Sequence, residues 1–193
     1  MVSTCRWQTR RMARPRLIDR AAVLDAALAL ADEAGDLATV TMSAVARRLA
    51  VTAMALYRHV ADKADLLDGL VELLVGEIAT AVDTGDGDPL TRYGAATRAV
   101  ARRHPAVFPL LLQRPAATPA AVALRDHLVE RLVASGVAPA AAPQVERVVS
   151  TLLLGFATSE VTGRFAHHDA ATLDADHRVL LDAARGVVDR GRP

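Results

Sequence analysis

Residues 41–67 read TMSAVARRLAVTAMALYRHVADKADLL, and this stretch decides the fold. Its first ten residues predict a short helix, because Thr41 has the side chain of a good N-cap. Val45, Ala46 and Leu49 then lie on one face of that helix. Since so short a helix needs tertiary contacts to be stable, we expect this apolar face to brace the element that follows.

A second short helix follows after a break centred on residues 50–52. Thr52 can cap a helix over residues 53–60. Two short helices joined by a tight turn are the sequence form of a helix-turn-helix, whose second helix fits the major groove of DNA. We expect Val51 and Leu56 to face inward, which leaves the other side chains of the second helix exposed.

Longer helices are expected on both sides of this unit. Residues 17–34 repeat apolar side chains at helical spacing and end before Gly35. The apolar face of this helix holds Leu17, Ala21, Leu24, Leu28 and Ala31. Residues 63–81 carry a broad stripe of leucine and other apolar residues. The turn-rich segment 83–89, Asp-Thr-Gly-Asp-Gly-Asp-Pro, then interrupts the helical pattern and predicts a linker.

The composition favours helices throughout the chain. Its 193 residues include 40 alanines and 25 leucines, which are the best helix formers, and only 3% aromatic residues, which favour strands. We therefore expect an all-α fold, with a three-helix DNA-binding head over residues 17–63 and a helical ligand-binding and dimerisation bundle over residues 64–193. The helices expected in the second region are 90–104, 119–135, 144–165 and 173–188, with a short apolar segment over 106–113.

Several classes of protein are excluded. The single cysteine, Cys5, rules out an internal disulfide framework and suits a reducing compartment. No apolar run reaches the roughly 18 residues of a membrane span, so we expect a soluble, cytoplasmic protein with no membrane partner. Residues 1–16 lack the apolar core of a secretory signal, and we expect them to form a disordered basic arm, with Met12 as an alternative start of the chain.

Charge is unevenly distributed although the net charge is only +1. Residues 1–63 hold nine arginines and one lysine against six acidic residues, a balance of +4, whereas residues 64–193 hold 13 arginines against 16 acidic residues, a balance of −3. A polyanion such as DNA would therefore bind the first region. Within it, Arg47 and Arg48 are expected to be solvated rather than to read bases.

The stretch from Leu37 to Leu67 resembles the TetR family of transcriptional repressors. In that family a threonine opens the second helix, an Ala-x-x-Leu segment braces it, a Leu-Tyr-x-His element lies in the recognition helix, and a lysine followed by leucines begins the fourth helix. More weakly, residues 103–115 and 138–160 resemble the regulatory half of the tetracycline-repressor branch. The matching residues of the head are Thr41, Ala46, Leu49, Val51, Leu56, Tyr57, His59, Lys63, Leu66 and Leu67.

One residue departs from the family pattern. Ala50 stands in the turn, where many members of the family have glycine. If the turn needs a positive φ, an alanine is strained there, because only glycine adopts that region without a steric penalty.

The helix-turn-helix supplies the candidate DNA contacts. Arg58 and Thr52 are candidates for base contacts, since an arginine can pair with two atoms of a guanine. The resemblance implies phosphate contacts for Tyr57, through its hydroxyl, and for Lys63, at the positive end of a helix. The alternatives are a partly buried aromatic ring for Tyr57 and a solvated charge for Lys63. The full candidate set is Thr41, Ser43, Thr52, Ala53, Met54, Tyr57, Arg58, His59 and Lys63.

The second region contains no recognisable catalytic motif. Its histidines lack metal-ligand spacing, and it has neither a glycine-rich phosphate loop nor a nucleophile elbow, so we expect no metal, no cofactor and no enzymatic activity. A helical cavity for a small-molecule effector is better supported, with core packing as the alternative for Phe108 and Phe156. The candidate cavity residues are His104, Phe108, Leu111, Leu112, Gln113, Phe156, Ser159 and Glu160.

One residue of the second region differs from the tetracycline-repressor branch. Leu110 stands where that branch has a metal-coordinating histidine, which argues against a tetracycline–magnesium effector. Another apolar small molecule stays open as the effector.

The resemblance also implies how the chain assembles and acts. The last two long helices are expected to pair with those of a second copy in a four-helix bundle. The resulting homodimer would repress genes by binding a palindromic double-stranded operator, with its recognition helices about 34–36 Å apart, until a small apolar effector releases it. Two alternatives from other classes are a helical small-molecule-binding enzyme and a structural dimer that does not bind DNA.

Overall fold

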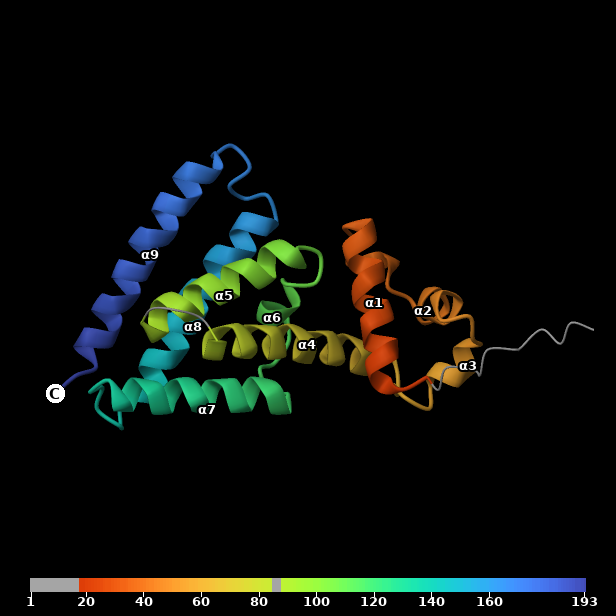
Figure 1. Ribbon diagram of the computed structural model, residues 1–193, viewed down its shortest axis with the longest axis horizontal. Coiled ribbons are helices and arrows are strands. Elements are labelled where there is room, and N and C mark those ends of the chain that lie inside the picture. The colour runs from red at the N-terminus through yellow and green to blue at the C-terminus, as the bar shows by residue number, and fades with distance from the viewer. Residues whose placement is uncertain (1–17, 85–87) are drawn as a thin grey trace, which may run out of the picture.

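The computed structural model describes residues 18–84 and 88–193 of the chain. Within these residues every regular element is a helix, which confirms the expected all-α fold (Figure 1). The arm expected over residues 1–16 lies outside the described residues. The elements are α1 (Arg20–Ala34), the 3₁₀ turn η1 (Leu37–Thr39), α2 (Met42–Arg48), α3 (Ala53–Leu56), α4 (Lys63–Thr84), α5 (Pro89–Arg103), α6 (Leu110–Gln113), α7 (Pro119–Ala134), α8 (Ala142–Val161) and α9 (Ala170–Arg190).

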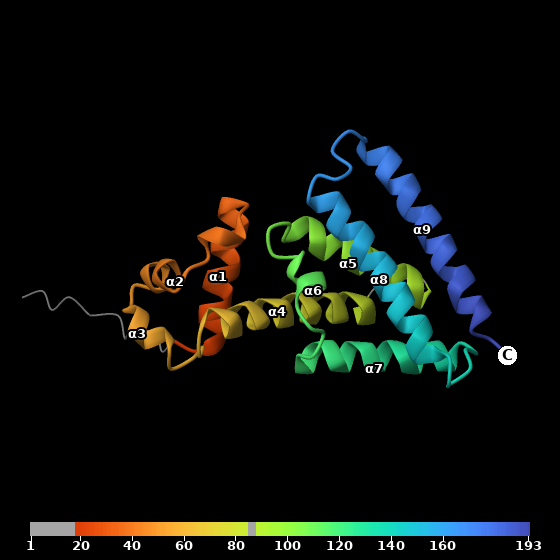
Figure 2. The same ribbon diagram turned by 180° about the vertical axis from the view of Figure 1, so that it is seen from behind.

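The helices form two groups that share α4. In both views α1, α2 and α3 lie at one end, which we call the head, and α5 to α9 lie at the other end, which we call the body (Figures 1 and 2). α4 runs from the head into the body and contacts α1, α5 and α7. Among the described helices, none is long and apolar enough to cross a membrane.

Helix starts follow local capping rules. The Thr41 hydroxyl accepts a hydrogen bond from the Ala44 amide at 3.1 Å, as the sequence predicts. Such a cap contributes about 1 kcal/mol, because it satisfies an amide that has no partner within the helix. α5 and α7 also begin with a proline, whose missing amide costs nothing at that position. Four other helices, α1, α5, α7 and α9, are capped in the same way by Asp19, Asp88, Thr118 and Asp169.

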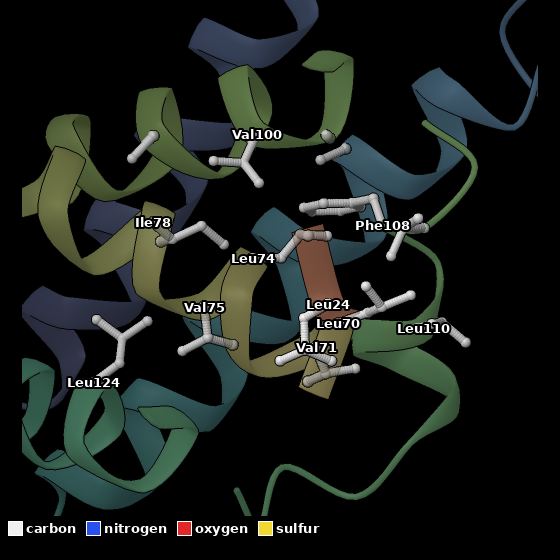
Figure 3. Close-up of a cluster of buried hydrophobic side chains, with 14 of the residues drawn as sticks. Leu24, Leu70, Val71, Leu74, Val75, Ile78, Val100, Phe108, Leu110 and Leu124 are labelled. Carbon is white, nitrogen blue, oxygen red and sulfur yellow. The ribbon is translucent and has the colours of Figure 1, made fainter. Parts of the chain in front are cut away.

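The core continues from the head into the body. Leu24 of α1 packs so closely on α4 that a Cβ added at Gly69 would lie 2.4 Å from Leu24 Cδ2. Further along α4, Leu70 and Leu74 are fully buried on the side facing Phe108, which is itself fully buried (Figure 3). Because burial of one such side chain contributes about 1.5–3 kcal/mol, α4 is held firmly by both groups of helices.

Three helices end three or four residues away from the predicted position. α3 ends at Leu56 rather than at residue 60. α4 continues to Thr84, into the segment predicted as a linker. α8 ends at Val161 rather than at residue 165, because Gly163, with a φ of +81°, takes the chain out of the helix.

The buried face of α1 is wider than predicted. Leu24 and Ala31 are buried as expected, but Ala21 is exposed, and Val23 and Ala27 are buried instead. The cause is that α1 contacts both α2 and α4, so that two sides of the helix are covered. The predicted division at residues 63 and 64 falls in the first turn of α4, which is continuous there, and it stays a prediction.

Candidate nucleic-acid interface and ligand cavity

The turn between α2 and α3 has a backbone conformation that alanine rarely adopts. Ala50 has a φ of +56° and is the only non-glycine residue with a positive φ among the described residues. Its amide donates to the carbonyl of Arg47 at 3.1 Å, and the Val51 amide donates to that of Ala46 at 3.0 Å. The turn therefore does require the positive φ at which an alanine is strained.

α3 presents several side chains away from the core. Leu56 is fully buried and holds the helix on the head, whereas Met54 and Tyr57 are 75% and 50% exposed. Thr52 occupies the N-cap position, but its side chain makes no capping hydrogen bond, so the hydroxyl can serve another partner. α2 and α3 lie beyond α1, at the end of the molecule (Figure 1). The predicted contacts that are exposed at this end are Thr41, Ser43, Thr52, Met54, Tyr57, Arg58 and Lys63.

Two predicted contact residues are less accessible than expected. Ala53 is half-buried against the core. His59 is also half-buried, and its carbonyl oxygen accepts a hydrogen bond from Arg20 Nη1 at 2.9 Å. The position of His59 follows from the shortness of α3, because the residues after Leu56 form turns instead of a further helical turn, and the His59 carbonyl is bound to α1.

An ion pair fixes the start of α4 to α1. Arg20 donates two hydrogen bonds to Asp65, at 2.6 Å and 3.0 Å, and the Ala61 amide donates a third at 2.7 Å. The hydrogen bond from Arg20, followed by that from Ala61, lowers the pKa of the Asp65 carboxyl below its ordinary value. Lys63, two residues before Asp65, is exposed and is the first residue of α4.

The described part of the head is not basic overall. Residues 18–63 carry four arginines and one lysine against six acidic residues, a balance of −1, so the positive balance of residues 1–63 comes from residues 1–17. Arg48 is paired with Glu33 at 2.6 Å. Three cations of the head form no ion pair with any residue that the structure describes and are available to phosphates: Arg47, Arg58 and Lys63.

The residues predicted to bind an effector are spread over different environments. Phe108 is fully buried in the core, which is the alternative foreseen for it. His104 is buried between the head and the body, with Nδ1 2.8 Å from Asp32 of α1 and Nε2 3.3 Å from Glu77 of α4. Of the others, Leu111 and Ser159 are half-buried, and Leu112 and Gln113 are exposed.

Glu160 belongs to an ion network inside the body. Its carboxylate lies 2.7 Å from Arg98 Nε and 2.6 Å from Arg102 Nη2. Burial alone would raise the pKa of Glu160, but the hydrogen bonds from the two arginines lower it below its ordinary value. Phe156 lies beside this network, with the Arg98 guanidinium 5.9 Å from the centre of its ring. Both predicted residues therefore have structural partners.

A cavity of about 440 Å³ lies between α5, α7, α8 and α9. Its volume is in the range of small-molecule sites. None of the predicted effector residues lines this cavity. One of them, Gln113, lines a second hollow of about 420 Å³ between the end of α1 and α6. The first cavity is lined by Asp88, Pro89, Leu90, Tyr93, Leu128, Arg131, Leu132, Ser135, Glu146, Val149, Ser150, Arg185, Val188, Asp189 and Arg192.

Three polar side chains meet at the wall of this cavity. The Tyr93 hydroxyl donates to Ser150 Oγ at 3.1 Å, and the Ser150 hydroxyl donates to Glu146 Oε1 at 2.6 Å. Burial raises the pKa of Tyr93 to about 12, and the Glu146 carboxylate adds to that rise, so Tyr93 stays a donor at neutral pH. Sequence reasoning missed this group, although Glu146 falls on the buried face of α8 beside Val145 and Val149.

Comparisons with known proteins agree with the helix-turn-helix. Residues 23–70, which span α1 to the first part of α4, match the family described as "Bacterial regulatory proteins, tetR family". A helix-turn-helix (HTH)-type transcriptional regulator of Saccharopolyspora erythraea is 31% identical over 157 residues, which cover 80% of this chain and 65% of the relative. The HTH-type transcriptional repressor DrrR1 of Streptomyces coeruleorubidus is 29% identical over 174 residues, which cover 88% and 64%. The chain thus spans slightly less than two thirds of the length of these relatives.

The fold as a whole also has a solved counterpart. A variant of TetR from Acinetobacter baumannii AYE, in complex with minocycline, superposes on this chain with a TM-score of 0.77 and 24% identity. The superposition covers 91% of this chain and 99% of the other. The arrangement of helices is therefore shared over both the head and the body.

Proposed function

The chain belongs to the TetR family of bacterial regulatory proteins, and on that premise we propose that it is a ligand-responsive transcriptional repressor. It binds a palindromic operator as a homodimer, and a small molecule bound in the body releases it. The observation that carries this proposal is the row of exposed side chains on and around α3, held by the turn at Ala50. The proposed contacts are Thr41, Ser43, Thr52, Ala53, Met54, Tyr57, Arg58, His59 and Lys63.

The exposed side chains divide into two kinds of DNA contact. Thr52 and Arg58 are proposed to reach base edges in the major groove, where a guanidinium can bind two acceptor atoms of a guanine. Tyr57 and Lys63 are proposed to bind phosphates on either side of the groove. Tyr57 is exposed directly after α3, and Lys63 is exposed at the positive N-terminal end of α4. Phosphate contacts position the head, and base contacts provide the specificity.

α8 and α9 carry the surface that we propose for the homodimer. On α8 Val148 and Leu152 are 41% and 37% exposed, and on α9 Val179 is 67% exposed, with Ala183 exposed one turn further on. Two helices with small and apolar outward faces can pair with the same two helices of a second copy in a closed four-helix bundle. Both helices lie at the end of the molecule remote from α3, so the two heads stay accessible (Figure 2).

Two observations support a ligand site in the body. The cavity of about 440 Å³ combines a buried polar group with apolar walls, which is typical of small-molecule sites. The solved structure from A. baumannii holds minocycline on the same fold. We therefore place the effector of this chain in the cavity between α5, α7, α8 and α9.

The contacts between the body and the head provide a route for the response. α5 lines the cavity near its start, and His104, directly after its last residue, binds Asp32 of the head. Arg114, after α6, binds Asp68 and the Ala64 carbonyl of α4. A ligand that favours one arrangement of α5 therefore acts on α1 and α4 together, and its effect is limited by its difference in affinity for the two arrangements.

A selection of bound sequences from random double-stranded DNA tests the proposal. The full-length chain should enrich a palindrome whose half-sites are centred about one helical turn apart. The selection is run at a fixed, stated salt concentration, because affinity for DNA falls steeply with salt. Failure to enrich any motif would contradict the proposal.

Variants of the head identify the contacts. Tyr57→Phe and Lys63→Ala should each weaken binding to all sequences, and Lys63→Ala should lower the slope of log affinity against log salt by about one per lost phosphate contact. Arg125→Ala, which removes an exposed cation of α7, is the matched control and should leave both quantities unchanged. Unchanged operator affinity in both head variants, with the fold intact, would argue for a structural dimer that does not bind DNA.

An enzymatic function is not favoured. The curated relatives are named as transcriptional regulators and not as enzymes.

A further inference from the structure

The cavity between α5, α7, α8 and α9 holds a buried carboxylate. Glu146 lines the cavity and is only 7% exposed. Its Oε1 atom accepts the hydrogen bond from Ser150, and no arginine, lysine or histidine within residues 18–84 and 88–193 forms an ion pair with it. A buried carboxylate costs free energy unless a cation or several hydrogen bonds compensate its charge. Among the residues that the structure describes, Glu146 therefore has no compensating cation.

The other charged residues around the cavity do not supply that cation. Arg185 lies at the rim and binds Asp88 at 3.2 Å. Arg192, also at the rim, lies 3.6 Å from Asp189. Arg131 is exposed and forms no ion pair with Glu146. Two of the three arginines at the rim are thus engaged in ion pairs with aspartates, whereas Glu146 in the interior pairs with none of the three.

The rest of the interior is suited to an apolar ligand. Leu128 and Leu132 of α7, Val149 of α8 and Val188 of α9 form the walls. The hydroxyl of Tyr93 is already engaged with Ser150, so the carboxylate is the main polar group that a ligand would meet. Apolar walls with one precisely placed charged group are typical of sites for amphiphilic ions.

We propose that this cavity binds a small amphiphilic cation, with a protonated amine at Glu146 and an apolar body against α7, α8 and α9. A charged hydrogen bond to a buried carboxylate is much stronger than a neutral one, so a cation is preferred over a neutral molecule of the same shape. This inference rests on the proposed function and specifies the chemical class of its effector.

Three compounds that differ only in their polar end test the charge preference. 4-Phenylbutylamine is a cation at neutral pH, 4-phenylbutanol is neutral and 4-phenylbutyrate is an anion. Titration calorimetry with the full-length chain should show the amine binding at least about tenfold more tightly than the alcohol, and the anion binding most weakly. Equal affinity of the amine and the alcohol, tighter binding of the anion, or no binding of the amine at about 1 mM would overturn the proposal.

A variant locates the effect. Glu146→Gln keeps the shape and the acceptor for Ser150 but removes the charge, so it should reduce the affinity for the amine to that for the alcohol, which itself stays unchanged. Glu130→Gln, at an exposed position of α7, is the control and should bind as the wild type does. If Glu146→Gln does not fold, the three-compound series on the wild type still decides. Because no DNA is present, failure here is distinguishable from failure of operator binding.

Discussion

The left-handed backbone of Ala50 places steric strain in the turn that positions α3. An L-amino acid in this region costs roughly 1–2 kcal/mol, because its Cβ approaches a carbonyl oxygen. The hydrogen bonds that Ala50 and Val51 donate to the end of α2, together with the burial of Leu56, hold the turn in spite of this cost. The position of α3, which we propose to contact DNA, is thus maintained by contacts on both sides of one strained residue.

Ala50→Gly should stabilise the protein. Relief of the strain outweighs the larger chain entropy of glycine in the unfolded state, and we expect the free energy of unfolding to rise by about 0.5–1 kcal/mol. Urea denaturation measures this change. Ala99→Gly, at an exposed position inside α5, is the matched control and should lower the free energy of unfolding by about 1 kcal/mol. A similar loss in both variants would show that Ala50 is not strained.

The contact of His104 with Asp32 should contribute more to the free energy of unfolding than the exposed ion pair of Arg103 with Glu77. His104→Ala leaves the partly buried Asp32 carboxylate without its partner, and we expect a loss of about 1–3 kcal/mol in the free energy of unfolding. Arg103→Ala removes an ion pair with Glu77 whose arginine is 61% exposed, so the expected loss is below about 1 kcal/mol. Equal losses in urea denaturation would mean that His104 does not join the body to the head.

The sequence predicts those helix ends that are set by a single local residue, such as a cap, a proline or a glycine. Thr41 caps α2, Pro119 begins α7, and Gly35 ends α1 in the left-handed conformation, all as expected. The end of α3 could not be predicted, because no residue between 53 and 60 is a helix breaker. The chain leaves the helix after Leu56, and three residues later the His59 carbonyl is bound to Arg20, a contact between residues 39 positions apart.

The same distinction separates the two candidate sites. The exposed positions of Tyr57 and Lys63 follow from a local motif, so their accessibility could be predicted. The ligand cavity depends on the packing of α5 against α8, since the hydrogen bond between Tyr93 and Ser150 joins residues 57 positions apart. Phe108, near which the sequence predicts the ligand cavity, instead fills its own space in the core.

The ion pair between α1 and α4 should make stability depend on pH. The pKa of Asp65 is lowered in the folded protein, chiefly by Arg20, so its contribution is present above the unfolded pKa of about 3.9 and is lost as the pH falls through the folded pKa. We expect Asp65→Asn to cost about 1 kcal/mol at pH 7, since both partners are partly exposed and screened. The difference from the wild type should shrink below about pH 4.

Urea denaturation at pH 7, 5, 4 and 3 measures this dependence. Asp25→Asn, at an exposed position of α1, is the control and should follow the wild type at every pH. A difference between Asp65→Asn and the wild type that stays constant down to pH 3 would be inconsistent with a charge-dependent link between α1 and α4.

The whole molecule has its two proposed binding surfaces at opposite ends. α3 lies at one end, and the outward faces of α8 and α9 lie near the other, with α4 joining the head to the body (Figure 1). Two copies paired through α8 and α9 would present two heads related by a two-fold axis, as a palindrome requires. Operator affinity should therefore depend on side chains that never contact DNA.

A charge placed on the proposed dimer surface tests this dependence. Leu152→Arg combined with Val179→Arg buries two unpaired guanidinium groups per chain at the interface, so the mass in sedimentation equilibrium should fall from that of a dimer to 20.4 kDa. Val133→Arg, on α7, changes a residue of the same 37% exposure as Leu152 and should leave the dimer intact. Because one head alone holds only a half-site, operator affinity should fall by at least about 100-fold in the double variant only. A double variant that stays dimeric, or a Val133→Arg chain that becomes monomeric, would place the interface away from α8 and α9.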